Sequence, residues 1–265
     1  MRVSLVTPSY NQASFIRRTI DSVLEQRGDF ELDYKVIDGG STDGTRAILE
    51  SYGGRLTWVS ERDRGQVDAI NRGLRAATGD IVGWLNSDDV LLPGALARVA
   101  ESFAAHPDGE WLHGRCMIID EHDREVRKWI SAYKHYRSQR HTLRSFLTEN
   151  YVSQMTVFWK RTLHSEIGYL DPEIRYAFDY DLWLRLAHRS EPIYVEEPLA
   201  CFRWYATSKS GGNYVVQMTE TAEIASRSRA ATNWTRVRAL AKKSAIINIY
   251  RALGVARTTL DRFRA

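Results

Sequence analysis

Residues 79–89 have the sequence Gly-Asp-Ile-Val-Gly-Trp-Leu-Asn-Ser-Asp-Asp, an apolar run that ends in two adjacent carboxylates, Asp88 and Asp89. Taken alone, Ser-Asp-Asp also suits a surface turn or a helix cap. The apolar strand before it changes the interpretation, because ligands bind at the carboxyl ends of strands in a parallel α/β sheet. The stretch therefore predicts two hard oxygen donors at a ligand-binding edge, where they suit a divalent metal that carries phosphates.

Strand and helix patterns alternate upstream of this stretch. The expected strands, each with the helix that follows it, are 3–6 with 16–24, 34–37 with 45–52, and 56–59 with 67–77. Another helix begins near Pro93, because proline is favoured at the first helical position. This alternation predicts βαβ units on a parallel sheet, with their loops gathered at one edge.

The pattern changes after residue 105, where strand-like runs have longer, polar and aromatic connections. The expected strands are 111–119, 126–130, 155–159 and 193–195, and the expected helices are 179–188 and 237–263. A mixed sheet should therefore extend the parallel one.

Composition limits the class of protein. The chain has 265 residues, 43% of them hydrophobic, which allows one large domain or a domain with an appendage and excludes a disordered chain. Its two cysteines, Cys116 and Cys201, stand far apart in apolar contexts, as expected in a reducing compartment. Pro8 comes too early for a signal peptide, and no apolar run approaches membrane-spanning length. We therefore expect a cytoplasmic protein.

Positive charge is concentrated in the C-terminal segment. Residues 227–265 hold ten Lys or Arg and one acid, a net charge of +9 in a chain whose total is +4, so residues 1–226 carry −5. We expect one domain over 1–215 and a basic helical extension over 216–265. The extension either packs on that domain or on a second subunit of a homodimer, or it lies on an anionic membrane surface. No recognition motif accompanies the charge, so nucleic acid is not an expected partner.

Polar loops after the first two strands offer groups for a nucleotide. Residues 7–12, Thr-Pro-Ser-Tyr-Asn-Gln, combine small polar side chains with an aromatic face, although an ordinary capped turn has the same composition. Asp38 ends the second strand just before two glycines, which permit close backbone approach. A turn role is equally open to Asp38.

Four motifs, in this order, resemble those of the glycosyltransferase family 2 enzymes. They are Thr-Pro-Ser-Tyr-Asn at 7–11, Ile-Asp-Gly-Gly-Ser-Thr-Asp-Gly-Thr at 37–45, Gly-Gln-Val-Asp-Ala-Ile-Asn-Arg-Gly at 65–73 and Trp-Leu-Asn-Ser-Asp-Asp at 84–89. The resemblance covers roughly residues 1–205, and the ordered set is far more specific than any one motif. It implies the GT-A fold, which is Rossmann-like with a mostly parallel central sheet. It also implies transfer of a sugar from a nucleotide diphosphate donor with inversion.

Carried over residue by residue, the resemblance implies which side chains surround the donor nucleotide. They are Pro8, Tyr10, Asp38, Asp63, Asn71 and Asp88, the last facing the ribose or a metal-bound water. Asp89 would coordinate Mg²⁺ or Mn²⁺ that bridges the donor phosphates. Such a cation stabilises the negative charge that develops on the leaving diphosphate. Uridine is the leading nucleotide, because the family favours it.

Residues 178–185, Phe-Asp-Tyr-Asp-Leu-Trp-Leu-Arg, resemble the family's acidic motif before a helix. The resemblance implies that Asp179 is the base, which accepts the proton of the acceptor hydroxyl during a single displacement. Asp181 remains the rival base, and a helix N-cap is the structural alternative for Asp179.

The chain departs from the family pattern at three positions. Phe178 stands where many members have Glu, Tyr205 where many have His, and Gly39 where a second Asp is frequent. Any metal or phosphate role of that His is therefore lost, and Asp38 is left as the only carboxylate at its site.

A basic loop with Arg203, Ser208 and Lys209 could reach diphosphate oxygens, although a solvated loop has the same composition.

Together these features predict an inverting, metal-dependent glycosyltransferase. Its donor would be a nucleotide-diphospho-sugar, and its acceptor a surface glycan or glycolipid at the inner face of the cell membrane. One alternative is a sugar-1-phosphate nucleotidyltransferase, although the Gly-rich N-terminal loop with Arg and Lys expected there is absent. The other is a noncatalytic sugar- or membrane-binding protein.

Overall fold

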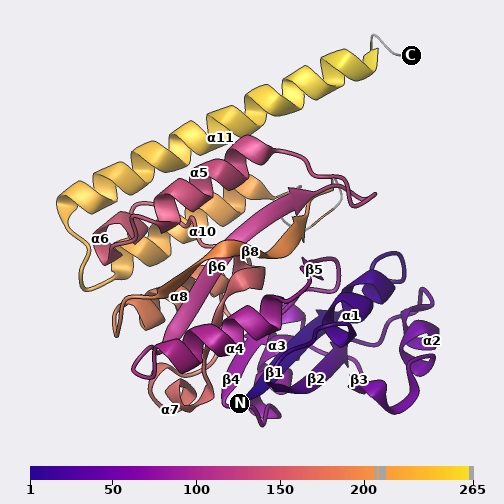
Figure 1. Cartoon of the computed structure of the whole chain (residues 1–265). Coiled ribbons are helices and arrows are strands. Elements are labelled where there is room, and N and C mark those ends of the chain that lie inside the picture. Colours follow the sequence, from indigo (N-terminus) through magenta and orange to yellow (C-terminus); the bar gives the residue numbers. More distant parts are fainter. Residues whose placement is uncertain (206–207, 209–212, 263–265) are drawn as a thin grey trace.

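The computed structural model describes residues 1–205, 208 and 213–262 of the chain. Its centre is a mixed sheet, in which the described strands have the order β3-β2-β1-β4-β7-β6-β8-β5 (Figure 1). The strands are β1 (Arg2–Ser9), β2 (Glu31–Asp38), β3 (Thr57–Ser60), β4 (Ile81–Trp84), β5 (Val90–Leu91), β6 (Trp111–Ile119), β7 (Phe158–Lys160) and β8 (Ile193–Arg203).

The first half of the sheet is parallel, as the alternating pattern predicts. β1 pairs in parallel with β2 and β4, and β2 pairs in parallel with β3. Both faces of β1 are buried, because Val3 and Leu5 belong to one core cluster and Val6 belongs to the other. This arrangement brings the loops after β1, β2 and β4 to the same edge.

The second half of the sheet is mixed. β7 lies antiparallel between β4 and β6, β8 runs parallel to β6, and the short β5 pairs antiparallel with β8. The expected strand over 126–130 is wrong, because helix α5 begins at Lys128. Short apolar runs do not distinguish strand from helix by periodicity alone.

Helices cover both faces of the sheet. In the first core cluster, α3 and α8 pack on the strands, and in the second, α1 and α4 do so. The helices are α1 (Ile16–Leu24), α2 (Thr45–Glu50), α3 (Gln66–Arg75), α4 (Ala95–Ala105), α5 (Lys128–Ser138), α6 (Leu143–Phe146), α7 (His164–Ile167), α8 (Phe178–Ala187), α10 (Tyr214–Arg227) and α11 (Asn233–Arg262), with 3-10 turns η1 (Gly53–Arg55), η2 (Gln154–Thr156) and η3 (Arg161–Leu163).

The basic C-terminal helices are joined to the rest of the molecule. Together with α5 they form a layer at the top of Figure 1, away from β1–β3. Glu220 of α10 accepts hydrogen bonds from the backbone N–H groups of Tyr176 (2.7 Å) and Ala177 (3.0 Å), just before α8. Lys242 of α11 forms an ion pair with Glu149, with 2.5 Å between Nζ and Oε2. These contacts make α10 and α11 part of the wall of the site described below.

Among the described helices, none combines the length and the apolarity that a bilayer crossing requires.

Candidate active site

A continuous cleft of about 1320 Å³ runs between two parts of the molecule. The loop end is lined by the end of β1, by the loops after β1, β2 and β4 and by the segment before α3. Its residues include Pro8, Tyr10, Gly39, Asp63 and Asp88. The helix end is lined by residues of α5, α10, α11 and the segment after α6, including Trp129, Tyr133, Lys134, Glu149, Lys242 and Lys243. Because small-molecule sites usually enclose roughly 300–1,000 Å³, the cleft has room for two ligands side by side.

The loops after β1 and β2 are hydrogen-bonded to each other at the loop end. Pro8 is buried at the end of β1, and Tyr10 is 61% exposed at the rim. Two hydrogen bonds join the loop after β1 to the loop after β2. The Asn11 backbone N–H donates to Ser41 Oγ (2.7 Å), and the Thr42 N–H donates to Asn11 Oδ1 (2.9 Å). These bonds hold Asn11 at a φ of 51° and so fix the loop that presents Tyr10.

Asp38 lies beneath this edge, and its carboxylate is not part of the cleft wall. It is fully buried, and it accepts hydrogen bonds from the backbone N–H groups of Gly40 (3.2 Å) and Ser41 (2.9 Å) and from Ser60 Oγ (2.7 Å). The structure therefore places Asp38 where it shapes the glycine loop.

Gly39 and Asp63 come together at the loop end, and both line the cleft. A Cβ at position 39 would lie 2.7 Å from Asp63 Oδ2, so any side chain there would collide with this carboxylate. Asp63 in turn accepts a hydrogen bond from the Gly65 N–H (2.8 Å), which holds it at the start of α3. The glycine that replaces a frequent family Asp therefore makes room for the Asp63 carboxylate.

Asp88 and Asp89 point in different directions. Asp88 lines the cleft, and its Oδ2 accepts a hydrogen bond from the Tyr205 hydroxyl at 2.9 Å. Asp89 is fully buried, and its carboxylate accepts from the Arg203 N–H (2.9 Å) and the Asn86 amide (3.2 Å). Burial raises the pKa of both carboxyls, and the neighbouring Asp88 charge raises that of Asp89 further. The structure thus brings Asp88 to the cleft, and not the expected metal ligand Asp89.

Arg203 is also turned away from the cleft. Its side chain is 2% exposed, its Nε donates to the Asp88 carbonyl (2.9 Å), and its guanidinium forms an ion pair with Asp123 (2.5 Å). Arg203 therefore cross-links the end of β8 to the Asp88 turn, whereas the sequence led us to expect contacts with diphosphate oxygens. Ser208 lines the cleft, whereas Lys209 lies outside the described residues.

Asn71 is buried in α3, and its side chain forms hydrogen bonds with a loop that is distant in the sequence. Its Nδ2 donates to the Leu170 carbonyl (2.8 Å), and its Oδ1 accepts from the Leu170 N–H (3.0 Å). These two bonds fix the segment that leads to α8, so Asn71 positions the site from outside the cleft.

Asp179 lies at the first turn of α8 and lines the same cleft as Asp88. Its Oδ1 accepts a hydrogen bond from the Tyr180 N–H at 2.7 Å. Asp181, two residues on, is bound by Arg185, with 2.7 Å between Oδ2 and Nη2, and it is not among the lining residues. Of the two rival carboxylates, the structure brings Asp179 to the cleft.

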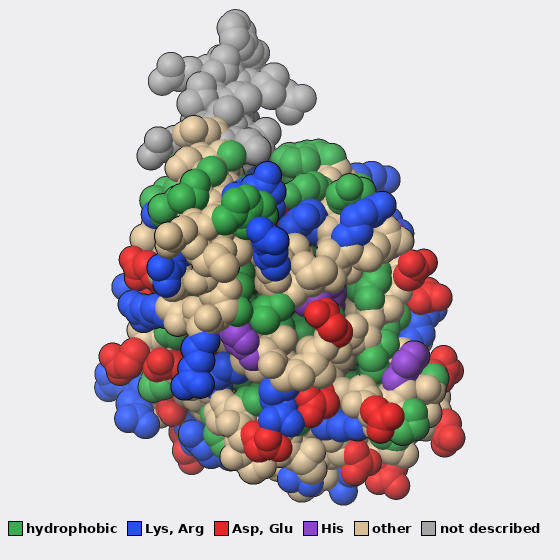
Figure 2. Space-filling view, turned by 90° about the vertical axis from the view of Figure 1, so that its left-hand side faces the viewer, with side chains coloured by type: hydrophobic (Ala, Val, Ile, Leu, Met, Phe, Trp, Pro, Cys, Tyr) green, Lys and Arg blue, Asp and Glu red, His purple; other side chains and the backbone are tan. Residues whose placement is uncertain are grey.

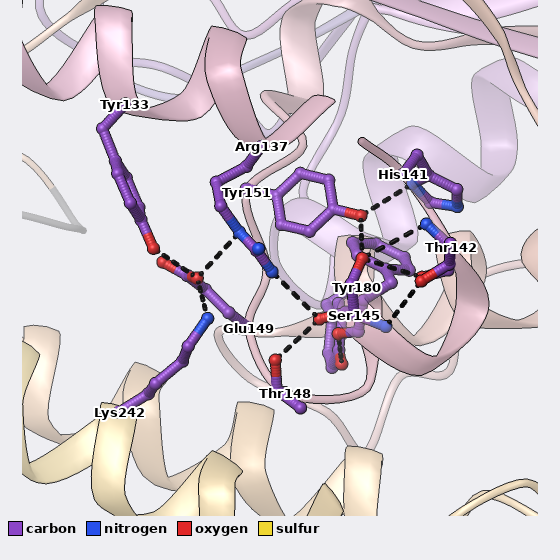
Figure 3. Close-up of polar contacts among 11 residues, drawn as sticks. Tyr133, Arg137, His141, Thr142, Ser145, Thr148, Glu149, Tyr151, Tyr180 and Lys242 are labelled. Atoms are coloured by element: carbon purple, nitrogen blue, oxygen red, sulfur yellow. Dashed lines mark hydrogen bonds and ion pairs between the residues drawn. The ribbon is translucent and has the colours of Figure 1, made fainter. Parts of the chain in front are cut away.

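Glu149 is the centre of a polar network at the helix end (Figure 3). Its Oε2 accepts a hydrogen bond from the Tyr133 hydroxyl (2.8 Å), and it forms ion pairs with Lys242 (2.5 Å) and Arg137 (3.5 Å). Burial, together with the Glu149 carboxylate, raises the pKa of Tyr133 to about 12.

The sequence patterns did not reveal this network. They predict a strand over 126–130, whereas α5 begins at Lys128, and they do not predict the rest of this helix, which carries Tyr133. They also place Lys242 in a separate tail. No motif spacing joins these residues, which come from three separate segments of the chain.

No group of three or more His, Cys, Asp or Glu side chains is placed to hold a metal ion within the part of the chain that the structure describes. In phosphate-handling sites, however, Mg²⁺ is usually held by one or two carboxylates together with waters and substrate phosphates. Asp88, a carboxylate on the cleft wall, fits such a site as its protein ligand.

Comparisons with known proteins identify the family of the chain. The model of the family described as glycosyl transferase family 2 matches residues 4–166. The PGL/p-HBAD biosynthesis glycosyltransferase of Mycobacterium tuberculosis is 31% identical over 188 residues, which are 69% of this chain and 68% of that protein. An uncharacterized glycosyltransferase of Rickettsia typhi is 26% identical over 200 residues. That match takes in 74% of this chain but only 62% of the rickettsial protein.

Solved structures resemble the chain in fold. Residues 1–349 of Staphylococcus aureus TarS, in complex with UDP-GlcNAc, align with a TM-score of 0.67 and 19% identity over 92% of this chain and 71% of that one. The mannosyltransferase PcManGT from Pyrobaculum calidifontis, in complex with GDP-Man and Mn²⁺, aligns with a TM-score of 0.63 and 20% identity over 97% of this chain and 79% of that one. These likenesses confirm the expected GT-A fold.

Proposed function

The chain belongs to glycosyl transferase family 2, and from this membership we propose that it transfers a sugar from a nucleotide-diphosphate donor with inversion. The observation that carries the proposal is that Asp88 and Asp179, from separate parts of the sequence, line one cleft. One carboxylate suits a metal-bound diphosphate and the other suits a general base.

The donor nucleotide would occupy the loop end. Pro8, Tyr10 and Asp63 line that end and offer an apolar surface, an aromatic face and a carboxylate. Asp38 and Asn71 would support this end from beneath, through the backbone bonds that they make. Two structural neighbours hold UDP-GlcNAc and GDP-Man, and we propose a UDP-sugar as the donor of this chain.

We assign the metal-binding role to Asp88 in place of Asp89. A bound Mg²⁺ or Mn²⁺ would stabilise the negative charge on the departing diphosphate. The Tyr205 hydroxyl orients the Asp88 carboxylate, while Asp89 and Arg203 hold the backbone of the turn.

Asp179 would act as the base of a single displacement. The acceptor oxygen forms a bond to the sugar C1 as the bond from C1 to the β-phosphate oxygen breaks, and the hydroxyl proton passes to the Asp179 carboxylate. Asp179 lies in the first turn of α8, where the helix dipole favours a negatively charged side chain.

The donor assignment can be tested by thermal denaturation with a panel of UDP- and GDP-sugars and Mn²⁺. A ligand at 100 times its Kd stabilises a protein by about 2.7 kcal/mol, which predicts a rise in Tm of roughly 5–10 °C for one donor. Slow metal-dependent release of nucleoside diphosphate from that donor supports transfer. Stabilisation without turnover supports the noncatalytic alternative. Synthesis of the donor from a sugar 1-phosphate and a nucleoside triphosphate, with release of pyrophosphate, supports the nucleotidyltransferase.

We further propose that residues 1–215 form the GT-A domain and that the extension 216–265, which also lines the helix end of the cleft, brings this domain to an anionic membrane that carries a glycan or glycolipid acceptor. Helix α11 has apolar side chains that are 44–65% exposed, namely Trp234, Val237 and Leu240. Figure 2 shows hydrophobic and basic side chains next to each other near the top of the molecule, the level at which α11 lies in Figure 1. This mixture suits the interface between lipid head groups and water.

Truncation after Asn248 tests the membrane proposal, because it removes four arginines and keeps the Lys242–Glu149 ion pair. Each basic residue near an anionic surface contributes about 1 kcal/mol, so binding to phosphatidylglycerol vesicles should weaken at least tenfold at low salt. Donor binding should stay unchanged. Equal vesicle binding by the truncated and intact chains, or a dimer that buries α11, would refute the proposal.

A further inference from the structure

Lys134 of α5 lies in the wall of the cleft, and no carboxylate of the part of the chain that the structure describes forms an ion pair with it. Its half-buried side chain donates a hydrogen bond to Ser153 Oγ at 3.2 Å, and no carboxylate of the described residues lies within 4 Å of its Nζ. Burial lowers the pKa of Lys134, and the Cys116 thiol and the charges of Asp179 and Glu149 oppose this effect. Because an unpaired cation is costly to bury, an anionic ligand beside Lys134 would offset this cost.

The neighbouring cations at the helix end differ from Lys134. Figure 3 shows Arg137 and Lys242 directed at Glu149, so both have a carboxylate partner within the protein. Lys243 of α11 lines the same end and, like Lys134, has no carboxylate within 4 Å among the described residues. Two lysines at this end are therefore available to a ligand.

The surroundings of Lys134 indicate which ligand would supply the anion. The carboxylates that act on it are Asp179, the proposed base, and Glu149 of the helix end. The rim of this end is aromatic, because Trp129 (56% exposed) and Tyr133 (43% exposed) both line the cleft. Cations beside an apolar rim suit an amphiphilic molecule with an anionic group.

We propose that the helix end is the acceptor site and that Lys134, aided by Lys243, binds a phosphate ester on the acceptor. This inference rests on the proposed function, and it adds the chemical class of the acceptor. The lysine ammonium groups would hold the phosphate as point charges, so that the acceptor hydroxyl is presented to Asp179.

Binding of decyl phosphate, below its micellar concentration, tests the assignment against decyl glucoside as an uncharged probe with the same chain. The intact protein should bind decyl phosphate at least tenfold more tightly than decyl glucoside, and Lys134→Met should remove this preference. Lys134→Arg keeps the charge and should retain the preference within about threefold. Lys128→Met is the matched control, because Lys128 lies on the same helix, is 74% exposed and pairs with Glu125.

Binding of UDP with Mn²⁺ to the same variants separates this inference from the proposed function. Lys134→Met should leave UDP affinity unchanged within twofold. The inference is overturned if the intact protein shows no preference for decyl phosphate or if Lys134→Met keeps that preference. It is also overturned if Lys134→Met weakens UDP binding as much as it weakens decyl phosphate binding. Failure of the intact protein to bind any nucleotide would instead count against the proposed function.

Discussion

Asp179→Asn should lower kcat for sugar transfer by about 10²–10⁴-fold, because a positioned general base contributes this much to the rate. The amide is nearly the same size and can still accept the Tyr180 N–H bond, so the start of α8 should stay intact. Donor affinity should remain within about threefold of the unmodified protein, since a base acts on the acceptor proton and not on the donor. Single-turnover transfer and donor titration measure the two quantities separately.

Asp181→Asn is the matched control for this prediction. It removes a carboxylate that is 26% exposed and bound to Arg185, so stability should fall by no more than about 1 kcal/mol. Transfer should stay within about threefold. The opposite result, an active Asp179→Asn and an inactive Asp181→Asn, would assign the base to Asp181.

Asp88→Asn should remove the dependence of donor binding on Mn²⁺ or Mg²⁺. A carboxylate that holds a cation on the diphosphate is worth several kcal/mol, so kcat/KM should fall by about 10²-fold or more. Affinity for the donor without metal should be unchanged. Isothermal titration of the donor, with and without Mn²⁺, gives both values.

Two further variants test whether metal-dependent donor binding depends on the Asp88 carboxylate itself or on the residues around it. Asp89→Asn keeps an oxygen for the Arg203 N–H and lies outside the cleft, so it should retain metal-dependent binding. Tyr205→Phe removes the hydroxyl that bonds to Asp88 but keeps the Asp88 carboxylate, so it should reduce metal-dependent binding by less than Asp88→Asn. If Asp89→Asn abolishes metal-dependent binding while Asp88→Asn does not, Asp89 is the ligand after all.

The family and the parallel half of the fold could be predicted from local sequence. An apolar run between turn residues forms a strand because its own residues favour it, and such runs at 3–6, 34–37 and 81–84 lie in β1, β2 and β4. The family resemblance, rather than position alone, named Asp88 and Asp179 as site residues, with Asp89 as the expected metal ligand. The start of helix α5 at Lys128 could not be predicted, because the apolar residues near it suit a strand as well as a helix.

The orientation of individual site residues depends instead on contacts between distant parts of the chain. Asp89 is turned inward by the N–H group of Arg203, 114 residues away, and the Arg203 guanidinium is held by the loop with Asp123. Lys134 reaches the cleft because α5 packs across β6. Local patterns identify which residues stand at the ends of strands and helices. Packing of the folded chain then decides which of them face the ligand, because a buried polar group turns toward the partner that satisfies its hydrogen bonds.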